Sequence, residues 1–183
     1  DHEVITDRVG IRSVGVDGTA LKVNDRDIVF RGVNRHDSDP VTGPVISLEQ
    51  LMTDLRLMKQ HNVNAIRSSH YPNSPYFYQL CDELGFYVID EANIEAHAYN
   101  RSLADDPAYR ATWLDRGARM IERDRNHPSV IAWSLGNEAG YGLNHRALAA
   151  WMRASDPTRP LHYEDAVRIE GWADGGREAS DLV

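Results

Sequence analysis

A carboxylate that follows a short apolar run is the clearest chemical feature of this sequence. Glu138 stands directly after Asn137, just beyond the apolar run 130–135. If that run is a buried strand, Glu138 lies at its carboxyl end, where we expect burial to raise its pKa toward the range useful for proton donation. Glu138 is therefore a candidate general acid or base. The structural alternative, in which Glu138 caps the next helix and Asn137 satisfies backbone groups of the turn, is equally compatible with the pattern.

Glu95 and His97 place two potential metal ligands two residues apart, and Glu138 is a potential third. Carboxylate oxygens together with one imidazole suit a divalent ion such as Mg²⁺ or Mn²⁺. Because a Glu-x-His triplet arises often by chance, the triplet alone favours a pair of solvated loop residues over a metal site.

Two histidines follow apolar runs in the same way. His36 comes after the run 28–34, and His70 comes after the run 64–68. At equivalent positions on neighbouring strands they would face the same cavity mouth, which favours contact with a ligand over a structural role. His127 precedes a run instead, so we expect it to be structural.

Short apolar runs alternate with helical patterns, which predicts a parallel sheet with right-handed crossovers. Ser47 and Gln50 form a capping box at the start of one helix, and Gly85 stops another that opens at Pro75. The predicted strands are 28–34, 64–68, 86–90, 130–135 and 161–163, and the predicted helices are 48–58, 75–84, 109–125 and 144–154.

The polar segments that follow these strands favour a TIM barrel over a doubly wound sheet. No Gly-x-Gly-x-x-Gly motif follows the first strand, which weakens the dinucleotide-binding alternative. A (β/α)₈ barrel takes about 250 residues, so residues 28–183 supply only about five of its units. We therefore predict an α/β fold that is a partial TIM barrel. Arg67, inside a predicted strand, should pair with a carboxylate of this barrel because buried arginine is seldom left unpaired.

Residues 1–27 differ from the rest of the chain in their pattern of polar and apolar residues. Alternating polar and apolar residues, with turns at Asp17-Gly18 and Asn24-Asp25, predict a β-ribbon. The chain begins at Asp1 rather than at a methionine and ends at Val183 within an apparently apolar run. We expect a piece of a longer protein.

Composition excludes several classes of protein. The 183 residues are 26% charged and 42% hydrophobic, which is typical of a globular domain rather than a disordered chain. A net charge of −8 argues against a nucleic-acid partner, and the absence of an apolar run of about 18 residues argues against a membrane span. Cys81 is the only cysteine, which excludes an internal disulfide, and we expect it to be a packed core thiol.

Four segments together resemble the catalytic barrel of glycoside hydrolase family 2. They are residues 31–36, 67–73, 90–95 and 124–138. The sequence Asn-Glu-Ala-Gly-Tyr-Gly at 137–142 is similar to the bacterial β-galactosidases of that family, and less similar to its β-glucuronidases, whose Asn-Glu is usually followed by Pro. The resemblance covers essentially the whole chain. It suggests that residues 1–27 are the tail of a preceding sandwich domain with a lead-in, and that residues 28–183 are the N-terminal part of the barrel.

The resemblance implies hydrolysis of terminal β-D-galactosyl residues by a retaining double displacement. In this mechanism Glu138 would be the general acid/base, and Asn137 would hydrogen-bond the sugar near its 2-hydroxyl group. His36 and His70 would contact the galactosyl unit. The resemblance also implies a Mg²⁺ ion, whose ligands would be Glu95, His97 and Glu138.

A retaining glycosidase needs a second carboxylate as nucleophile, about 5 Å from the first. In the family the nucleophile lies on a later strand, beyond Val183. Glu164 follows the last predicted strand but does not match the nucleophile motif, so we expect it to have a sugar-binding or structural role. We therefore expect the chain by itself to be inactive.

Other functions remain open from the sequence. The chain could belong to a β-glucuronidase or a β-mannosidase-like hydrolase, or it could be an inactive carbohydrate-binding fragment. A metal-dependent hydrolase that uses Glu95, His97 and Glu138 directly is a further alternative. The partners we expect are a β-galactoside and the remaining domains of a longer enzyme. Unpaired strand edges of an incomplete barrel predict self-association as a homo-oligomer, and we expect a cytoplasmic protein.

Overall fold

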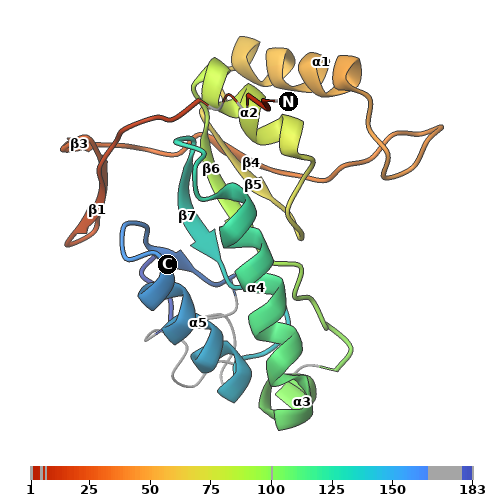
Figure 1. Ribbon diagram of the computed structural model, residues 1–183, viewed down its shortest axis with the longest axis vertical. Coiled ribbons are helices and arrows are strands. Elements are labelled where there is room, and N and C mark those ends of the chain that lie inside the picture. Colours follow the sequence, from red (N-terminus) through yellow and green to blue (C-terminus); the bar gives the residue numbers. More distant parts are fainter. Residues whose placement is uncertain (1, 5, 7, 100, 165–178, 183) are drawn as a thin grey trace.

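The computed structural model describes residues 2–4, 6, 8–99, 101–164 and 179–182 (Figure 1). Asp1 and Val183, the termini considered above, lie outside these residues. Five parallel strands form the main sheet, each paired with its neighbour in the chain, in the order β4-β5-β6-β7-β8. Their bounds are Gly32–Arg35, Ala65–Ser68, Tyr87–Glu91, Val130–Ser134 and Leu161–His162. This sequential parallel order is that of one side of a TIM barrel and confirms the predicted partial barrel.

Helices follow the strands as predicted. They are α1 (Leu48–Gln60), α2 (Pro75–Leu84), α4 (Arg110–Asp124) and α5 (Leu143–Ser155). Gly85 ends α2 with a φ of 71°, the left-handed conformation that glycine adopts without strain. Among the described residues, none of the helices has the length and hydropathy of a segment that crosses a membrane.

The start of α1 corrects part of the predicted capping box. The side chain of Ser47 accepts a hydrogen bond from the backbone N–H of Gln50 at 3.1 Å, as predicted. A capping box also needs a bond from the side chain of Gln50 back to the backbone N–H of Ser47. This second bond was predicted wrongly: the side-chain amide of Gln50 donates to Asp54 at 2.8 Å instead. Asp54 in turn pairs with the buried side chain of Arg35 at the end of β4, so Gln50 helps to hold helix to sheet.

A small antiparallel sheet precedes the barrel strands. It consists of β1 (Val14–Asp17), β2 (Ala20–Val23) and β3 (Arg26–Asp27). Positive φ angles at Gly18, Asn24 and Asp25 mark the two predicted turns. The β-ribbon is thus present, whereas the division of the chain into domains at residues 27 and 28 stays a prediction.

Two segments differ from the sequence prediction. The first barrel strand begins only at Gly32, because Ile28 donates its backbone N–H to Leu21 of the ribbon and so belongs to the lead-in. The segment between the predicted strand 86–90 and the predicted helix 109–125, for which no element was predicted, contains a short helix, α3 (Arg101–Asp105), and a 3₁₀ turn, η1 (Pro107–Tyr109). Both elements are too short for a hydrophobic period to reveal them.

The buried apolar side chains of strands and helices form one core. Cys81 and Trp133 are both fully buried within it, which confirms the predicted core thiol. Helix α4 packs closely on α5 at Gly117, where an added Cβ would lie 2.5 Å from Leu148 Cδ1 and 2.7 Å from Met152 Cε. The absence of a side chain at Gly117 therefore sets how closely these two helices approach.

The pleat of β6 sends its two acidic residues to opposite faces of the sheet. Asp90 points to the same side as Val88, toward the helices, and both are fully buried. Glu91 points to the other side, with Tyr87 and Ile89, which is the inner face of the barrel wall. Two adjacent carboxylates are thus placed in two separate environments.

Asp90 lies in a buried polar cluster on the helix side. Its Oδ1 accepts hydrogen bonds from Tyr78 Oη at 2.6 Å and from Ser68 Oγ at 3.1 Å. Burial raises the pKa of Asp90 well above its usual value, and the negative charge of Asp124 raises it further; Tyr78 and Arg123 act in the opposite direction. The folded protein therefore holds the Asp90 proton more tightly than the unfolded chain does.

Replacement of this carboxyl group should change how stability depends on pH. A raised folded-state pKa makes the free energy of unfolding fall as pH rises above about 4, by at most about 1.4 kcal/mol per pH unit for one proton. Asp90→Asn keeps an acceptor for Tyr78 and Ser68 and removes the titration, so its stability relative to the unaltered chain should grow from pH 4 upward. Urea denaturation across pH 4–9 measures this.

The matched control is Asp115→Asn, at an exposed position of α4. It should leave the pH dependence as it is in the unaltered chain. Parallel curves of unfolding free energy against pH for Asp90→Asn and the unaltered chain would contradict the assignment.

Candidate active site

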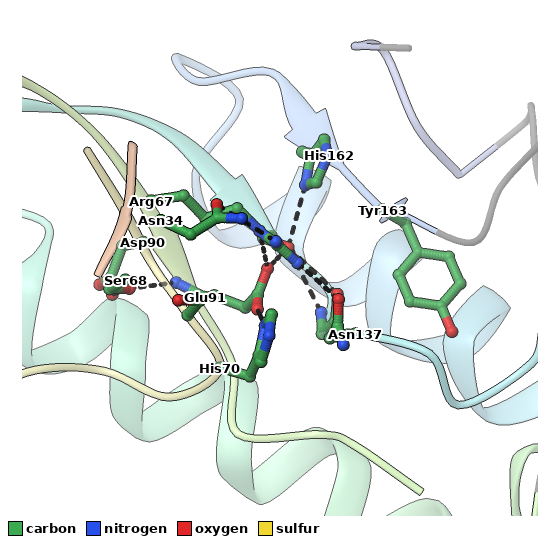
Figure 2. Close-up of polar contacts among 12 residues, drawn as sticks. Asn34, Arg67, Ser68, His70, Asp90, Glu91, Asn137, His162 and Tyr163 are labelled. Carbon is green, nitrogen blue, oxygen red and sulfur yellow. Dashed lines mark hydrogen bonds and ion pairs between the residues drawn. The ribbon is translucent and has the colours of Figure 1, made fainter. Parts of the chain in front are cut away.

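One polar residue from each barrel strand lies on the inner face, near the carboxyl ends of the strands. Asn34 of β4 pairs in register with Arg67 of β5, Glu91 of β6 pairs with Ser134 of β7, and Ser134 pairs with His162 of β8. Figure 2 shows Arg67 pointing toward Glu91, with Asn34 beside Arg67. A TIM barrel carries its functional groups at this end.

Glu91 is the centre of this polar row and is completely buried. Its Oε2 accepts hydrogen bonds from Arg67 Nε and from Ser134 Oγ, both at 2.6 Å. Its Oε1 lies 2.7 Å from Nδ1 of His70 (Figure 2). The prediction that Arg67 pairs with a barrel carboxylate is confirmed, and the partner is Glu91.

Asn137 is attached to the same group of residues through Arg67. The Nη2 of Arg67 donates to Asn137 Oδ1 at 2.8 Å, and Asn137 Nδ2 donates to Glu95 Oε1 at 3.3 Å. Its backbone N–H bonds the carbonyl oxygen of Ile94 at 2.8 Å. Asn137 therefore joins the loop after β7 to the loop after β6.

A glycine allows these two loops to meet. Gly136 has a φ of 129°, and a Cβ built on it would lie 2.3 Å from the carbonyl oxygen of Ile94. Any larger residue would push the loops apart, and with them Asn137 and Glu138.

Glu138 follows with a φ of 40°, and its side chain is 23% exposed. Its Oε2 lies 2.6 Å from Nδ1 of His97, whose side chain is 65% exposed. Helix α5 begins at Leu143 with Gly142 in the capping position, so the alternative in which Glu138 caps this helix is wrong. A partly exposed carboxylate at the carboxyl end of a buried strand can exchange a proton with a bound molecule.

The two predicted sugar-binding histidines lie side by side. The ring centroids of His36 and His70 are 5.2 Å apart in an edge-to-face arrangement, and His36 also contacts the ring of Tyr71. His36 is exposed and His70 is partly buried against Glu91. The order of the strands therefore places His36 beside His70. His70 contacts Glu91, and Arg67 bonds both Glu91 and Asn137.

The proposed magnesium ligands fit the ion by donor type, since two carboxylates and an imidazole suit Mg²⁺. In the structure His97 pairs with Glu138, and Glu95 accepts a hydrogen bond from Asn137. Within the described ranges, no three histidine, cysteine, aspartate or glutamate side chains are gathered closely enough to hold a metal. The magnesium site stays a prediction.

Burial and charge shift the ionisation of two groups in the polar row. Burial raises the pKa of Glu91, and the positive charge of Arg67 acts in the opposite direction. Burial, and then the charge of Arg67, lower the pKa of His162 to about 4, so His162 is neutral at pH 7. Arg67 is therefore the cation of this group.

Sequence reasoning missed Glu91, Ser134, His162 and Asn34 as members of the site. Side chains alternate between the two faces along a strand. This alternation places Glu91 and Arg67 on the same inner face of neighbouring strands, so it could have revealed Glu91. Ser134 and His162 lie inside the predicted strands 130–135 and 161–163, so the signal that singled out His36 and His70, a polar residue after an apolar run, does not apply to them.

Comparison with known proteins gives the following matches. The family model for "Glycosyl hydrolases family 2, TIM barrel domain" matches residues 14–178. A β-galactosidase of Yersinia enterocolitica is 52% identical over 158 residues, which are 85% of this chain and 15% of that protein. A β-galactosidase of Lactococcus lactis is 48% identical over 183 aligned positions, and the match covers 97% of this chain and 18% of that protein. The chain thus spans less than a fifth of the length of these relatives.

Solved structures share the fold at lower identity. A β-glucuronidase of Ruminococcus gnavus superimposes with a TM-score of 0.78 and 32% identity, over 85% of this chain and 28% of that one. A β-galacturonidase of Eisenbergiella tayi gives a TM-score of 0.78 and 28% identity, over 86% of this chain and 29% of that one.

Proposed function

Because the chain belongs to glycosyl hydrolase family 2, as part of its TIM barrel domain, we propose that it forms the acid/base side of the catalytic pocket of a β-galactoside hydrolase. One observation carries this proposal. A partly exposed Glu138 stands directly after a buried Asn137, which the Arg67–Glu91 pair holds at the carboxyl ends of the strands.

Glu138 is the proton donor and acceptor of the proposed reaction. In the first step it gives its proton to the glycosidic oxygen, while the nucleophilic carboxylate bonds to the anomeric carbon and the glycosidic bond breaks. In the second step it takes a proton from the water that displaces this carboxylate from the sugar. Asn137 Oδ1 is occupied by Arg67, so the residue is fixed in orientation before a sugar binds. His36 and His70 border the same end of the wall, where sugar hydroxyl groups would meet their ring nitrogens.

The proposed retaining mechanism needs a nucleophilic carboxylate about 5 Å from the acid/base. We propose that it comes from a part of a longer protein that is not in this sequence. The small share of the relatives that the chain spans, 15% and 18%, supports this proposal.

A galactoside is favoured over a glucuronide as substrate. The β-galactosidases matched are 48% and 52% identical to the chain, and the β-glucuronidase structure matched is 32% identical. Ala139 after Asn-Glu also fits the β-galactosidase pattern of the sequence resemblance. Cytoplasmic localisation and self-association stay predictions.

The substrate proposal predicts a difference between the isolated chain and a longer protein that contains it. The 183-residue chain should not hydrolyse a chromogenic β-galactoside, because it lacks the proposed nucleophile. The full-length protein should hydrolyse it with a kcat/KM about 100-fold or more above that for the matching β-glucuronide. Turnover by the isolated chain that Glu138→Gln abolishes would contradict the proposal, and so would a preference for the glucuronide.

The acid/base role of Glu138 predicts a dependence on the leaving group. In the full-length protein, Glu138→Gln should lower kcat/KM for an alkyl β-galactoside by about 10²- to 10⁴-fold. A dinitrophenyl β-galactoside should lose far less, because this leaving group departs without protonation. Steady-state kinetics measures both, with Glu49→Gln, an exposed carboxylate on α1, as the matched control. Equal losses for the two substrates would rule out the acid role.

We also propose that Glu95, His97 and Glu138 hold a Mg²⁺ ion, which would add positive charge beside the reacting oxygen atoms. Calorimetric titration of the full-length protein with MgCl₂ should show binding that His97→Ala and Glu95→Gln each weaken about tenfold or more, and that Glu49→Gln leaves unchanged. Equal binding by all four proteins would overturn this ligand set. Hydrolysis that needs the metal but no second carboxylate would instead support the metal-dependent alternative.

A further inference from the structure

Three hydrogen-bonding side chains converge on the buried carboxylate of Glu91. Arg67 Nε and Ser134 Oγ both donate to Oε2, and His70 Nδ1 lies at hydrogen-bond distance from Oε1. The positive charge of Arg67 and the two hydrogen bonds to Oε2 favour the ionised form of Glu91, in which both oxygens can only accept. Its nearest cation, Arg67, donates to three neighbours, Glu91, Asn137 and, at 3.5 Å, Asn34.

We propose that Glu91 is a positioning residue, which fixes the proton of His70 on Nδ1 and so makes His70 Nε2 an acceptor for a hydroxyl group of the sugar. This inference rests on the proposed function for the identity of the ligand, and on the hydrogen bonds of Glu91 for the rest. Glu91 also orients Arg67 and, through it, Asn137.

The ionised carboxylate determines which ring nitrogen of His70 carries the proton. Because Glu91 Oε1 can only accept, the proton of the 2.7 Å bond belongs to His70 Nδ1. The other ring nitrogen, Nε2, has no hydrogen-bond partner among the residues that the structure describes, and the side chain is 19% exposed. In the neutral ring this nitrogen carries a lone pair, which suits a hydroxyl donor.

Ser134 links Glu91 to the ring of His162. The hydroxyl group of Ser134 has one proton, which it donates to Glu91 at 2.6 Å. At 3.1 Å from His162 Nδ1 the serine oxygen must therefore accept, so His162 also carries its proton on Nδ1. His162 is not bonded to Glu91 directly, and this makes it an internal reference for any change at Glu91.

Replacement of Glu91 by glutamine should act on His70 and not on His162. The amide has one oxygen and one NH₂ group, and the positive charge of Arg67 attracts the oxygen. The oxygen can then accept from Arg67 and Ser134 as before, while the NH₂ group faces His70. Since the NH₂ group can only donate, His70 Nδ1 must become the acceptor, and the proton moves to Nε2.

The primary test is ¹⁵N NMR of the histidine rings in the 183-residue chain. Spectra are recorded at about pH 8.5, roughly two units above the usual histidine pKa, so that neutral tautomers are observed. In the unaltered chain His70 and His162 should both be protonated on Nδ1. In Glu91→Gln, His70 should switch to Nε2–H and His162 should not. His70→Gln and His162→Gln assign the two signals.

Asp90→Asn is the matched control, since Asp90 is the neighbouring buried carboxylate on the opposite face of β6. It should leave both tautomers unchanged. If Glu91→Gln does not fold, Glu91→Asp retains the negative charge and should keep His70 protonated on Nδ1. An unchanged His70 tautomer in a folded Glu91→Gln protein, or a switch in Asp90→Asn, would overturn the proposal.

A kinetic test in the full-length protein addresses the sugar. Glu91→Gln should lower kcat/KM for a β-galactoside by roughly 10- to 100-fold, and Glu91→Asp should recover part of the loss. Among monodeoxy galactosides, the one that lacks the hydroxyl group bound by His70 should lose least. A tautomer switch without a change in kcat/KM would overturn the role in binding. Failure of the unaltered full-length protein to hydrolyse any β-galactoside would overturn the proposed function but not the coupling of Glu91 to His70.

Discussion

The buried ion pair of Arg67 and Glu91 is the interaction around which the inner face of this barrel wall is built. A carboxylate without any exposure is costly unless it is paired and its remaining lone pairs are hydrogen-bonded. Glu91 meets this requirement with Arg67, Ser134 and His70. Removal of Arg67 would leave the buried charge of Glu91 unpaired. Through its three partners, Glu91 ties β6 to β5, to β7 and to the segment after β5 that carries His70.

The period of two in a strand explains how β6 supports both the fold and the site. Asp90 faces the helices, where burial and Asp124 favour its protonated form. Glu91 faces the interior, where burial also raises its pKa and the positive charge of Arg67 acts in the opposite direction. Adjacent residues with the same functional group thus have different charged neighbours, because the pleat sends them to opposite faces of the sheet: Asp90 lies near Asp124, and Glu91 lies beside Arg67.

Much of the fold follows from local patterns. The caps at Ser47 and Gly85 and the apolar spacing of the helices are local signals, and the structure agrees with them. The predictions that were wrong concern choices between competing partners. Ile28 bonds to the ribbon instead of to a barrel strand, and Gln50 bonds to Asp54 instead of to its own helix start. Local propensity cannot decide such choices, since the residue types are compatible with either partner and only the fold brings one of them within bonding distance.

By itself, the sequence determined the partial barrel, the family resemblance, and the acid, amide and histidine side chains at the ends of its strands. Only the tertiary structure decided which of them meet. Glu91 lies 24 residues from Arg67 and 43 from Ser134, and it is the parallel register that places all three on one face. The tertiary structure also decided that Glu138 pairs with His97 and that Asn137 is fixed by Arg67. The physical reason is that a hydrogen bond depends on distance and direction, which strand pairing sets and residue type does not.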